Sequence, residues 1–238
     1  MRVIDVLRNA LPSVITLAGF ACGLTVVLTG GALDEGGVPV RSAILILAAV
    51  IFDLLDGAAA RTLHAQSAFG RELDSLSDLV CFGVAPATLL HGALAPAHAT
   101  MGAITGGAFA VAAAIRLARF NVWSQRPDAA LGVSLGLTVP MAACTLIAVM
   151  LLGPGAAPPR VLGTVAPVLA LLMVSTIPYR TTKGLRPGVA LAAFGAVASI
   201  GACVAVVEGP AAALATLALG YAASGPVMLA ARYVCARA

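Results

Sequence analysis

Charged residues are scarce in this 238-residue sequence: they make up 10% of it, whereas 61% of the residues are hydrophobic. A water-soluble domain of this length needs more charged side chains to cover its surface, so the composition argues against that class. The mean hydropathy of +1.03 instead indicates a polytopic membrane protein. Only short stretches rich in Gly, Pro and Arg interrupt the apolar runs, so we expect a single membrane domain, residues 1–238.

Paired cysteines are also lacking. The five cysteines lie far apart, in or beside apolar runs, and form no Cys-x-x-Cys motif. This spacing argues against a zinc site and against a disulfide framework, and we expect the cysteines to be small packing residues. The net charge of +4 is modest and follows from membrane topology, so it gives no indication of nucleic-acid binding.

Eight apolar stretches have about the 20 residues that a helix needs to cross a bilayer. They lie at 14–33, 42–61, 73–94, 100–121, 132–152, 161–178, 188–207 and 211–231. The expected fold class is therefore all-α, a polytopic membrane bundle of about eight helices. Residues 1–12 separate charged from apolar side chains around a helix, which predicts an N-terminal interfacial helix that Pro12 turns into the membrane.

Basic residues are distributed unequally between the connections of these spans. Twelve of the 14 fall at the termini and in alternate connections, and only Arg41 and Arg160 fall in the others. Because basic residues favour the cytoplasmic side, this asymmetry places both termini and the 61–72 connection in the cytoplasm.

Acidic residues are rare outside one segment: five of the ten lie between positions 53 and 78, in or beside two predicted spans. Asp53 and Asp56 are three residues apart and Asp74 and Asp78 are four apart, so each pair shares a helix face. Antiparallel neighbours joined by a short loop bring the two faces together. Carboxylates at this depth need compensation, and a pair of Mg²⁺ or Mn²⁺ ions would supply it.

An ion-pathway role in a cation or proton transporter is an alternative interpretation of these aspartates. A transporter predicts acidic residues on several non-adjacent spans and a repeat between halves of the chain. The remaining spans are almost free of acidic residues, and no repeat between the halves is visible. Between the acidic pairs, Gly57 and Ala60 would let a flat group approach the backbone, and Arg61 offers a planar donor fork for phosphate.

Residues 53–78 read DLLDGAAARTLHAQSAFGRELDSLSD. They fit without a gap the signature D-x2-D-G-x2-A-R-x8-G-x3-D-x3-D of the CDP-alcohol phosphotransferases, and the chain resembles this family. The resemblance implies two divalent cations, Mg²⁺ or Mn²⁺, held by Asp53, Asp56, Asp74 and Asp78. It implies that Asp78 is the general base and that the CDP moiety is held by Gly57, Ala60, Arg61 and Gly70. The implied fold is a six-helix core, residues 13–180, followed by two additional helices, residues 187–232, usually in a homodimer with a cytoplasmic cavity.

Other stretches resemble bacterial and archaeal phosphatidylserine synthases: LPSVITLAGFACG near the start, RLARFNV at 116–122 and LLMVSTIPYR at 171–180. This similarity implies transfer of a phosphatidyl group from CDP-diacylglycerol to L-serine in a prokaryotic cytoplasmic membrane. Arg116, Arg119 and Arg180 are then candidates to bind the serine carboxylate or the lipid phosphate. Ser13 and Thr138 depart from the subfamily pattern, so glycerol 3-phosphate, an inositol phosphate and choline remain alternative acceptors.

Overall fold

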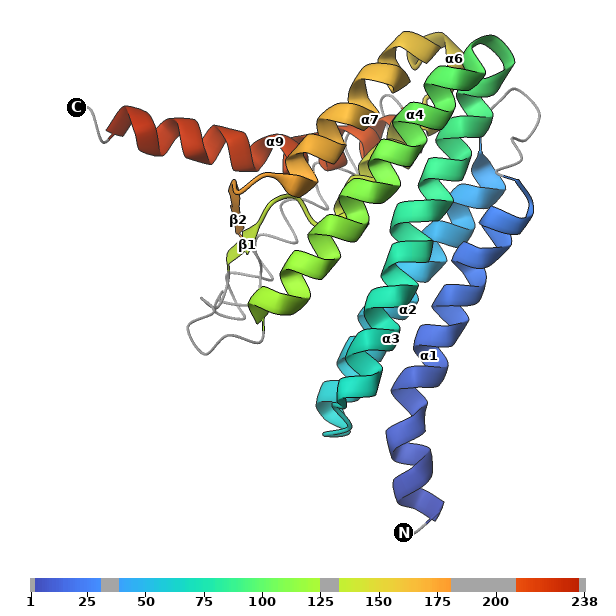
Figure 1. The fold of residues 1–238 in the computed structure, drawn as a ribbon, viewed down its shortest axis with the longest axis vertical. Coiled ribbons are helices and arrows are strands. Elements are labelled where there is room, and N and C mark those ends of the chain that lie inside the picture. The colour runs from blue at the N-terminus through green and yellow to red at the C-terminus, as the bar shows by residue number, and fades with distance from the viewer. Residues whose placement is uncertain (1–2, 31–38, 125–132, 181–208, 236–238) are drawn as a thin grey trace. The chain divides into compact units, whose positions relative to one another are not determined.

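The computed structural model describes residues 3–30, 39–124, 133–180 and 209–235 (Figure 1). Helices dominate these ranges, and the chain forms two compact units, Met1–Val111 and Ala112–Ala238. Four of the described helical stretches are long and apolar enough to cross a membrane: Ala10–Leu28, Val40–Thr62, Ala68–Pro96 and His98–Trp123. These findings confirm the expected membrane helix bundle. The division into one domain with a 13–180 core stays a prediction.

Helix α1 (Val3–Leu28) runs without interruption through Pro12. The turn that we expected at Pro12 is therefore absent. Proline is tolerated inside membrane helices because neighbouring groups and small local adjustments satisfy the carbonyl that loses its partner. The residues before Pro12 form the first turns of α1, and their location at the membrane interface stays a prediction.

Helices α2 (Val40–Thr62) and α3 (Ala68–Asp78) form the expected hairpin, with a short turn between them. Ser67 begins α3 as its N-cap, accepting a hydrogen bond of 2.9 Å from the backbone N–H of Gly70. Helix α1 packs against both α2 and α3, and the three helices lie side by side in Figure 1. This three-helix arrangement carries the four signature aspartates on α2 and α3.

The chain stays helical after Asp78. Helix α3 leads directly into a π-helical segment, η1 (Leu79–Val84), and then into α4 (Ala85–Ser124). Helix α4 breaks at His98, two residues after Pro96, where the backbone leaves the helical region (φ −148°, ψ 62°). The break separates the two spans that the sequence predicts here.

The second unit contains four further helices and two short strands in the described residues: β1 (Val133–Leu135), α5 (Val139–Leu151), α6 (Gly153–Ala156), α7 (Pro159–Val174), β2 (Pro178–Arg180) and α9 (Pro210–Cys235). The strands pair antiparallel, α5 packs against α7 and α9, and α9 contacts β2. No strand was expected. The span predicted at 132–152 begins with β1 and a left-handed Gly136 (φ 77°), and its helix starts only at Val139.

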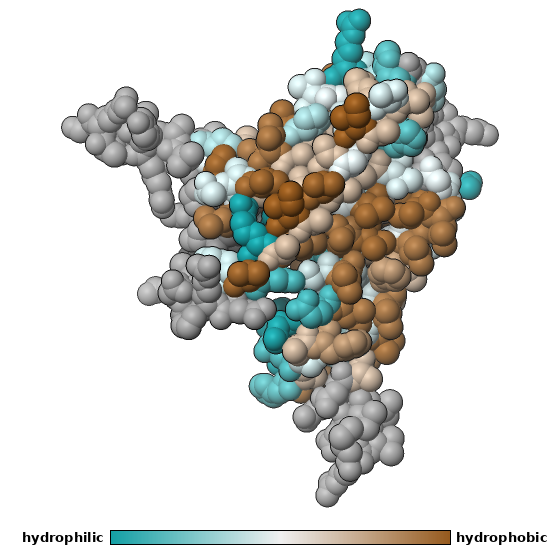
Figure 2. Space-filling model, in the orientation of Figure 1, coloured by the Kyte–Doolittle hydropathy of each residue, from teal (hydrophilic) through white to brown (hydrophobic). Residues whose placement is uncertain are grey.

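Large apolar side chains are exposed on the described helices, including Leu54 (65% exposed) and Leu171 (72%). Apolar residues also cover much of the face drawn in Figure 2. Such a surface is unfavourable in water but suits contact with lipid hydrocarbon, so it supports a multi-pass membrane protein. Helix α9 corresponds to the predicted last span, whereas the span predicted at 188–207 lies outside the described residues.

Candidate active site

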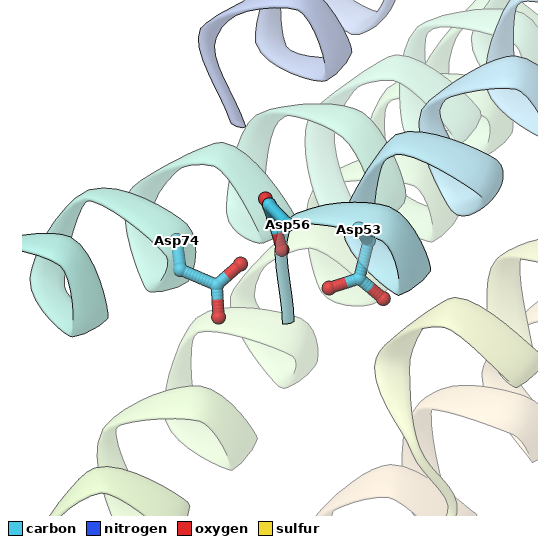
Figure 3. A group of neighbouring side chains, drawn as sticks. All are labelled: Asp53, Asp56 and Asp74. Carbon is cyan, nitrogen blue, oxygen red and sulfur yellow. The ribbon is translucent and has the colours of Figure 1, made fainter. Parts of the chain in front are cut away.

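Three of the four signature aspartates meet in the first unit. Asp53 and Asp56 extend from α2 and Asp74 from α3, and the three carboxylates face a common space (Figure 3). One oxygen from each lies within 4.8 Å of the others. Asp56 is buried, and Asp53 and Asp74 are partly buried. The convergence of the two helix faces, expected from the spacing, is confirmed for these three residues.

The geometry and chemistry of this cluster suit a divalent cation. Three carboxylates this close repel one another, and inserting each one deep in a membrane costs about 2.5–3.5 kcal/mol. A bound cation offsets both the repulsion and this cost. Oxygen ligands lie about 2.0–2.1 Å from Mg²⁺, so opposite ligands are about 4 Å apart, and the cluster needs little adjustment to surround an ion. An all-oxygen donor set favours Mg²⁺ or Mn²⁺ over softer metals. The number and identity of the ions stay predictions.

Asp56 is held by a residue of a third helix. Oγ1 of Thr16, on α1, donates a hydrogen bond of 2.6 Å to Oδ2 of Asp56. Both residues are buried. The bond holds one carboxylate oxygen of Asp56, so α1 contributes to the arrangement of the cluster.

Asp78 lies one helical turn after Asp74, at the last position of α3 before η1. It is partly buried and does not belong to the group of three converging carboxylates. Its position beside that group allows a role in proton transfer. Both of its expected functions, metal ligand and general base, stay predictions.

The glycines of the signature have distinct local roles. A Cβ at Gly57 would lie 3.3 Å from Nη1 of Arg61, so the absence of a side chain lets the guanidinium lie against the backbone next to Asp56. A Cβ at Gly70 would lie 3.1 Å from Oγ of Ser67, the residue that caps α3. Arg61 is exposed, where it can reach a phosphate group. The binding of CDP by these residues and by Ala60 stays a prediction.

The three arginines proposed for substrate binding belong to the second unit. Arg119 donates four hydrogen bonds to backbone carbonyls, which belong to Leu135, Met173, Val174 and Ser175. It therefore has a structural function at the end of α7 that the sequence did not indicate. Arg116 is buried, and its guanidinium carbon lies 5.2 Å from the centre of the Phe120 ring.

A cavity of roughly 430 Å³ lies next to Arg116 and Arg119, with Phe120, Trp123 and Leu135 among its lining residues. Arg180 lies in β2, and its side chain is outside the described residues. Substrate recognition by the three arginines stays a prediction.

Comparison with known proteins extends the signature match to most of the chain. The family model for CDP-alcohol phosphatidyltransferases matches residues 9–177, which include α1 from residue 9 onward, the elements from α2 to α7 and all the signature residues. The chain belongs to the CDP-alcohol phosphatidyltransferase family. The enzyme class expected from the sequence is thereby confirmed. Helix α9 lies beyond the part of the chain that the family model matches.

Several curated members of this family are similar to the chain. A CDP-diacylglycerol–serine O-phosphatidyltransferase of Bacillus subtilis is 34% identical over 140 residues, 58% of this chain and 74% of the relative. The protein of the same name from Methanocaldococcus jannaschii is 38% identical over 135 residues, 57% of this chain and 61% of the relative. The one from Mycobacterium bovis is 37% identical over 145 residues, 60% of this chain and 49% of the relative. The matched part thus spans about half to three quarters of these relatives.

Thr16 was not identified from the sequence as a residue of the site. It lies in the segment near the start that resembles the family, but threonines are common in membrane helices and usually bond to their own backbone. Its partner Asp56 is 40 residues away in the chain. Only the packing of α1 against α2 brings the two side chains together.

Proposed function

We propose that the chain transfers the phosphatidyl group of CDP-diacylglycerol to the hydroxyl of L-serine, giving phosphatidylserine and CMP. The observation that carries this proposal is the convergence of Asp53, Asp56 and Asp74 inside an intact family signature. The names of the similar proteins support CDP-diacylglycerol and serine as the substrates.

The signature aspartates would hold two divalent cations, Mg²⁺ or Mn²⁺. When bound, such ions supply positive charge that stabilises the pyrophosphate and the leaving phosphate. Arg61 would add hydrogen bonds to the pyrophosphate, while Gly57, Ala60 and Gly70 leave room for the cytidine. These residues would therefore orient the CDP moiety for the reaction.

Asp78 would accept the proton of the serine hydroxyl. The pKa of a free hydroxyl is too high for it to ionise near neutral pH, so a base must take the proton while the new bond forms. The serine oxygen then bonds to the β-phosphorus, the bond from this phosphorus to the bridging oxygen breaks, and CMP leaves with that oxygen. Arg116, Arg119 and Arg180 are the candidates to bind the serine carboxylate or the lipid phosphate.

The proposed setting is the cytoplasmic membrane of a prokaryote, with both termini and the active site on the cytoplasmic side. The distribution of basic residues supports this orientation. CDP-diacylglycerol would enter from the inner leaflet while its acyl chains stay in lipid. We also propose that the protein works as a homodimer, as is usual in the family.

An acceptor competition tests the proposal. The purified protein is mixed with CDP-diacylglycerol and Mn²⁺ or Mg²⁺, and CMP and lipid products are measured with L-serine, glycerol 3-phosphate, an inositol phosphate or choline. CMP and phosphatidylserine formed with L-serine alone would support the proposal. CMP release with only one of the other acceptors would mean that this acceptor, and not L-serine, is the substrate. Metal-dependent ion transport without CMP release would favour the transporter alternative.

A further inference from the structure

Thr16 lies on α1, which carries none of the four signature aspartates, yet its hydroxyl contacts one of them. Oγ1 lies 2.6 Å from Oδ2 of Asp56 and 3.0 Å from the carbonyl oxygen of Pro12. A separation of about 2.5–2.7 Å is typical of a hydroxyl that donates to an ionised carboxylate. The longer contact is the back-bond that threonine usually forms in a helix. Since the hydroxyl has a single hydrogen, the distances favour donation to Asp56.

The backbone around Thr16 is fixed against the other aspartate helix. Oγ of Ser77, on α3, donates to the carbonyl oxygen of Thr16 at 3.5 Å. Farther along α1, a Cβ at Gly23 would lie 2.7 Å from Cα of Cys81 in η1, so the two backbones are in close contact there. Thr16 is therefore held beside α3 and η1 while its side chain reaches α2.

We propose that Thr16 is a positioning residue of the metal site. Its hydroxyl holds Oδ2 of Asp56, and this bond sets the direction in which the other carboxylate oxygen points. The proposal rests on the proposed function, because it assumes that Asp56 ligates a metal ion. Hydrogen-bond partners of metal ligands fix the orientation of the ligand, and their loss typically lowers metal affinity or activity about 10–100-fold.

Three substitutions isolate the hydroxyl of Thr16. Thr16→Val removes it at nearly constant volume, Thr16→Ala removes it without adding a methyl group, and Thr16→Ser keeps it. Thr25→Val is the matched control, because Thr25 lies on the same helix and its exposed hydroxyl bonds to the backbone carbonyl of Ala21 at 2.7 Å. All variants are made in the full-length chain and purified in lipid nanodiscs. Circular dichroism without metal confirms that each is folded.

The readout is Mn²⁺ affinity, measured by the loss of the electron paramagnetic resonance signal of free Mn²⁺. We expect Thr16→Val and Thr16→Ala to raise the Kd for Mn²⁺ about tenfold or more, and Thr16→Ser to stay within about threefold of the unmodified protein. Thr25→Val should leave the Kd unchanged. The Mn²⁺ concentration for half-maximal CMP release should shift in parallel, with a smaller change in the KM for CDP-diacylglycerol.

Several results would overturn the proposal. Unchanged Mn²⁺ affinity in a folded Thr16→Val protein would refute it, as would equal losses in Thr16→Val and Thr25→Val. Failure of both Thr16→Val and Thr16→Ala to fold would mean that Thr16 serves the fold rather than the site. If the unmodified protein released CMP and lost Mn²⁺ affinity on Asp74→Asn, but Thr16→Val bound Mn²⁺ normally, only the inference on Thr16 would fail. If the unmodified protein itself released no CMP, the proposed function would fail.

Discussion

Arg119 stabilises the end of α7, and its replacement should destabilise the protein. Its guanidinium donates to four carbonyl oxygens at 2.7–3.2 Å, and three of these belong to residues 173–175. The last carbonyls of a helix lack partners within the helix, and the helix dipole favours a cation there. Hydrogen bonds from a charged donor contribute about 1.5–3 kcal/mol each. Two of the four are solvent-exposed and all share one side chain, so we expect a total of about 3 kcal/mol.

Arg119→Gln tests this estimate through thermal unfolding, followed by circular dichroism in detergent. A loss of about 3 kcal/mol should lower the Tm by roughly 6–12 °C for a chain of this size. Arg119→Lys should recover only part of the loss, since an ammonium group keeps the charge but cannot bridge several carbonyls as the planar guanidinium does.

Arg160→Gln is the matched control, because Arg160 is an exposed arginine at the opposite end of α7. It should shift the Tm by about 2 °C at most. An equal, small shift for Arg119→Gln and Arg160→Gln would refute the structural role of Arg119.

Three further substitutions test the helix contact at Gly23, the role of Asp78 and the hydrogen bond of Tyr179. Gly23→Ala should lower both Tm and CMP release, because its Cβ would lie 2.7 Å from Cα of Cys81 and push α1 from η1; a normal Tm would show that this contact is not close in the protein. Asp78→Asn should abolish CMP release but keep CDP-lipid binding, measured by calorimetry, and normal turnover would exclude Asp78 as the base. Tyr179→Phe should cost about 1–2 kcal/mol in unfolding free energy, since its buried hydroxyl donates to the carbonyl of Ala222 in α9 at 2.9 Å; an unchanged unfolding free energy would remove this link between β2 and α9.

The aspartate cluster could be predicted from the sequence because its geometry follows from local rules. Asp53 and Asp56 share a face through helix periodicity, and the short turn after Thr62 makes α2 and α3 antiparallel neighbours. Hydropathy also predicted the described membrane helices, because each is a continuous apolar stretch whose length is set by the thickness of the bilayer. These features depend on residues near one another in the chain.

Contacts between distant residues could not be predicted in this way. Two examples are the hydrogen bond from Thr16 to Asp56 and those from Arg119 to residues 173–175. They depend on which helices pack together and on how far the helices are shifted along their axes. The pairing of β1 with β2 also joins distant segments, and hydropathy cannot distinguish three extended residues from the first turn of a helix. The sequence predicts a turn at Pro12 because proline usually interrupts helices in water, whereas α1 continues through it.

Anomalous X-ray scattering from crystals soaked in Mn²⁺ would show whether the three converging carboxylates bind a metal ion. We expect Mn²⁺ density within coordination distance, about 2.2 Å, of carboxylate oxygens of Asp53, Asp56 and Asp74, and its loss in Asp74→Asn crystals treated in the same way. Mn²⁺ density only at other sites, or density at the cluster that is unchanged in Asp74→Asn, would contradict this expectation.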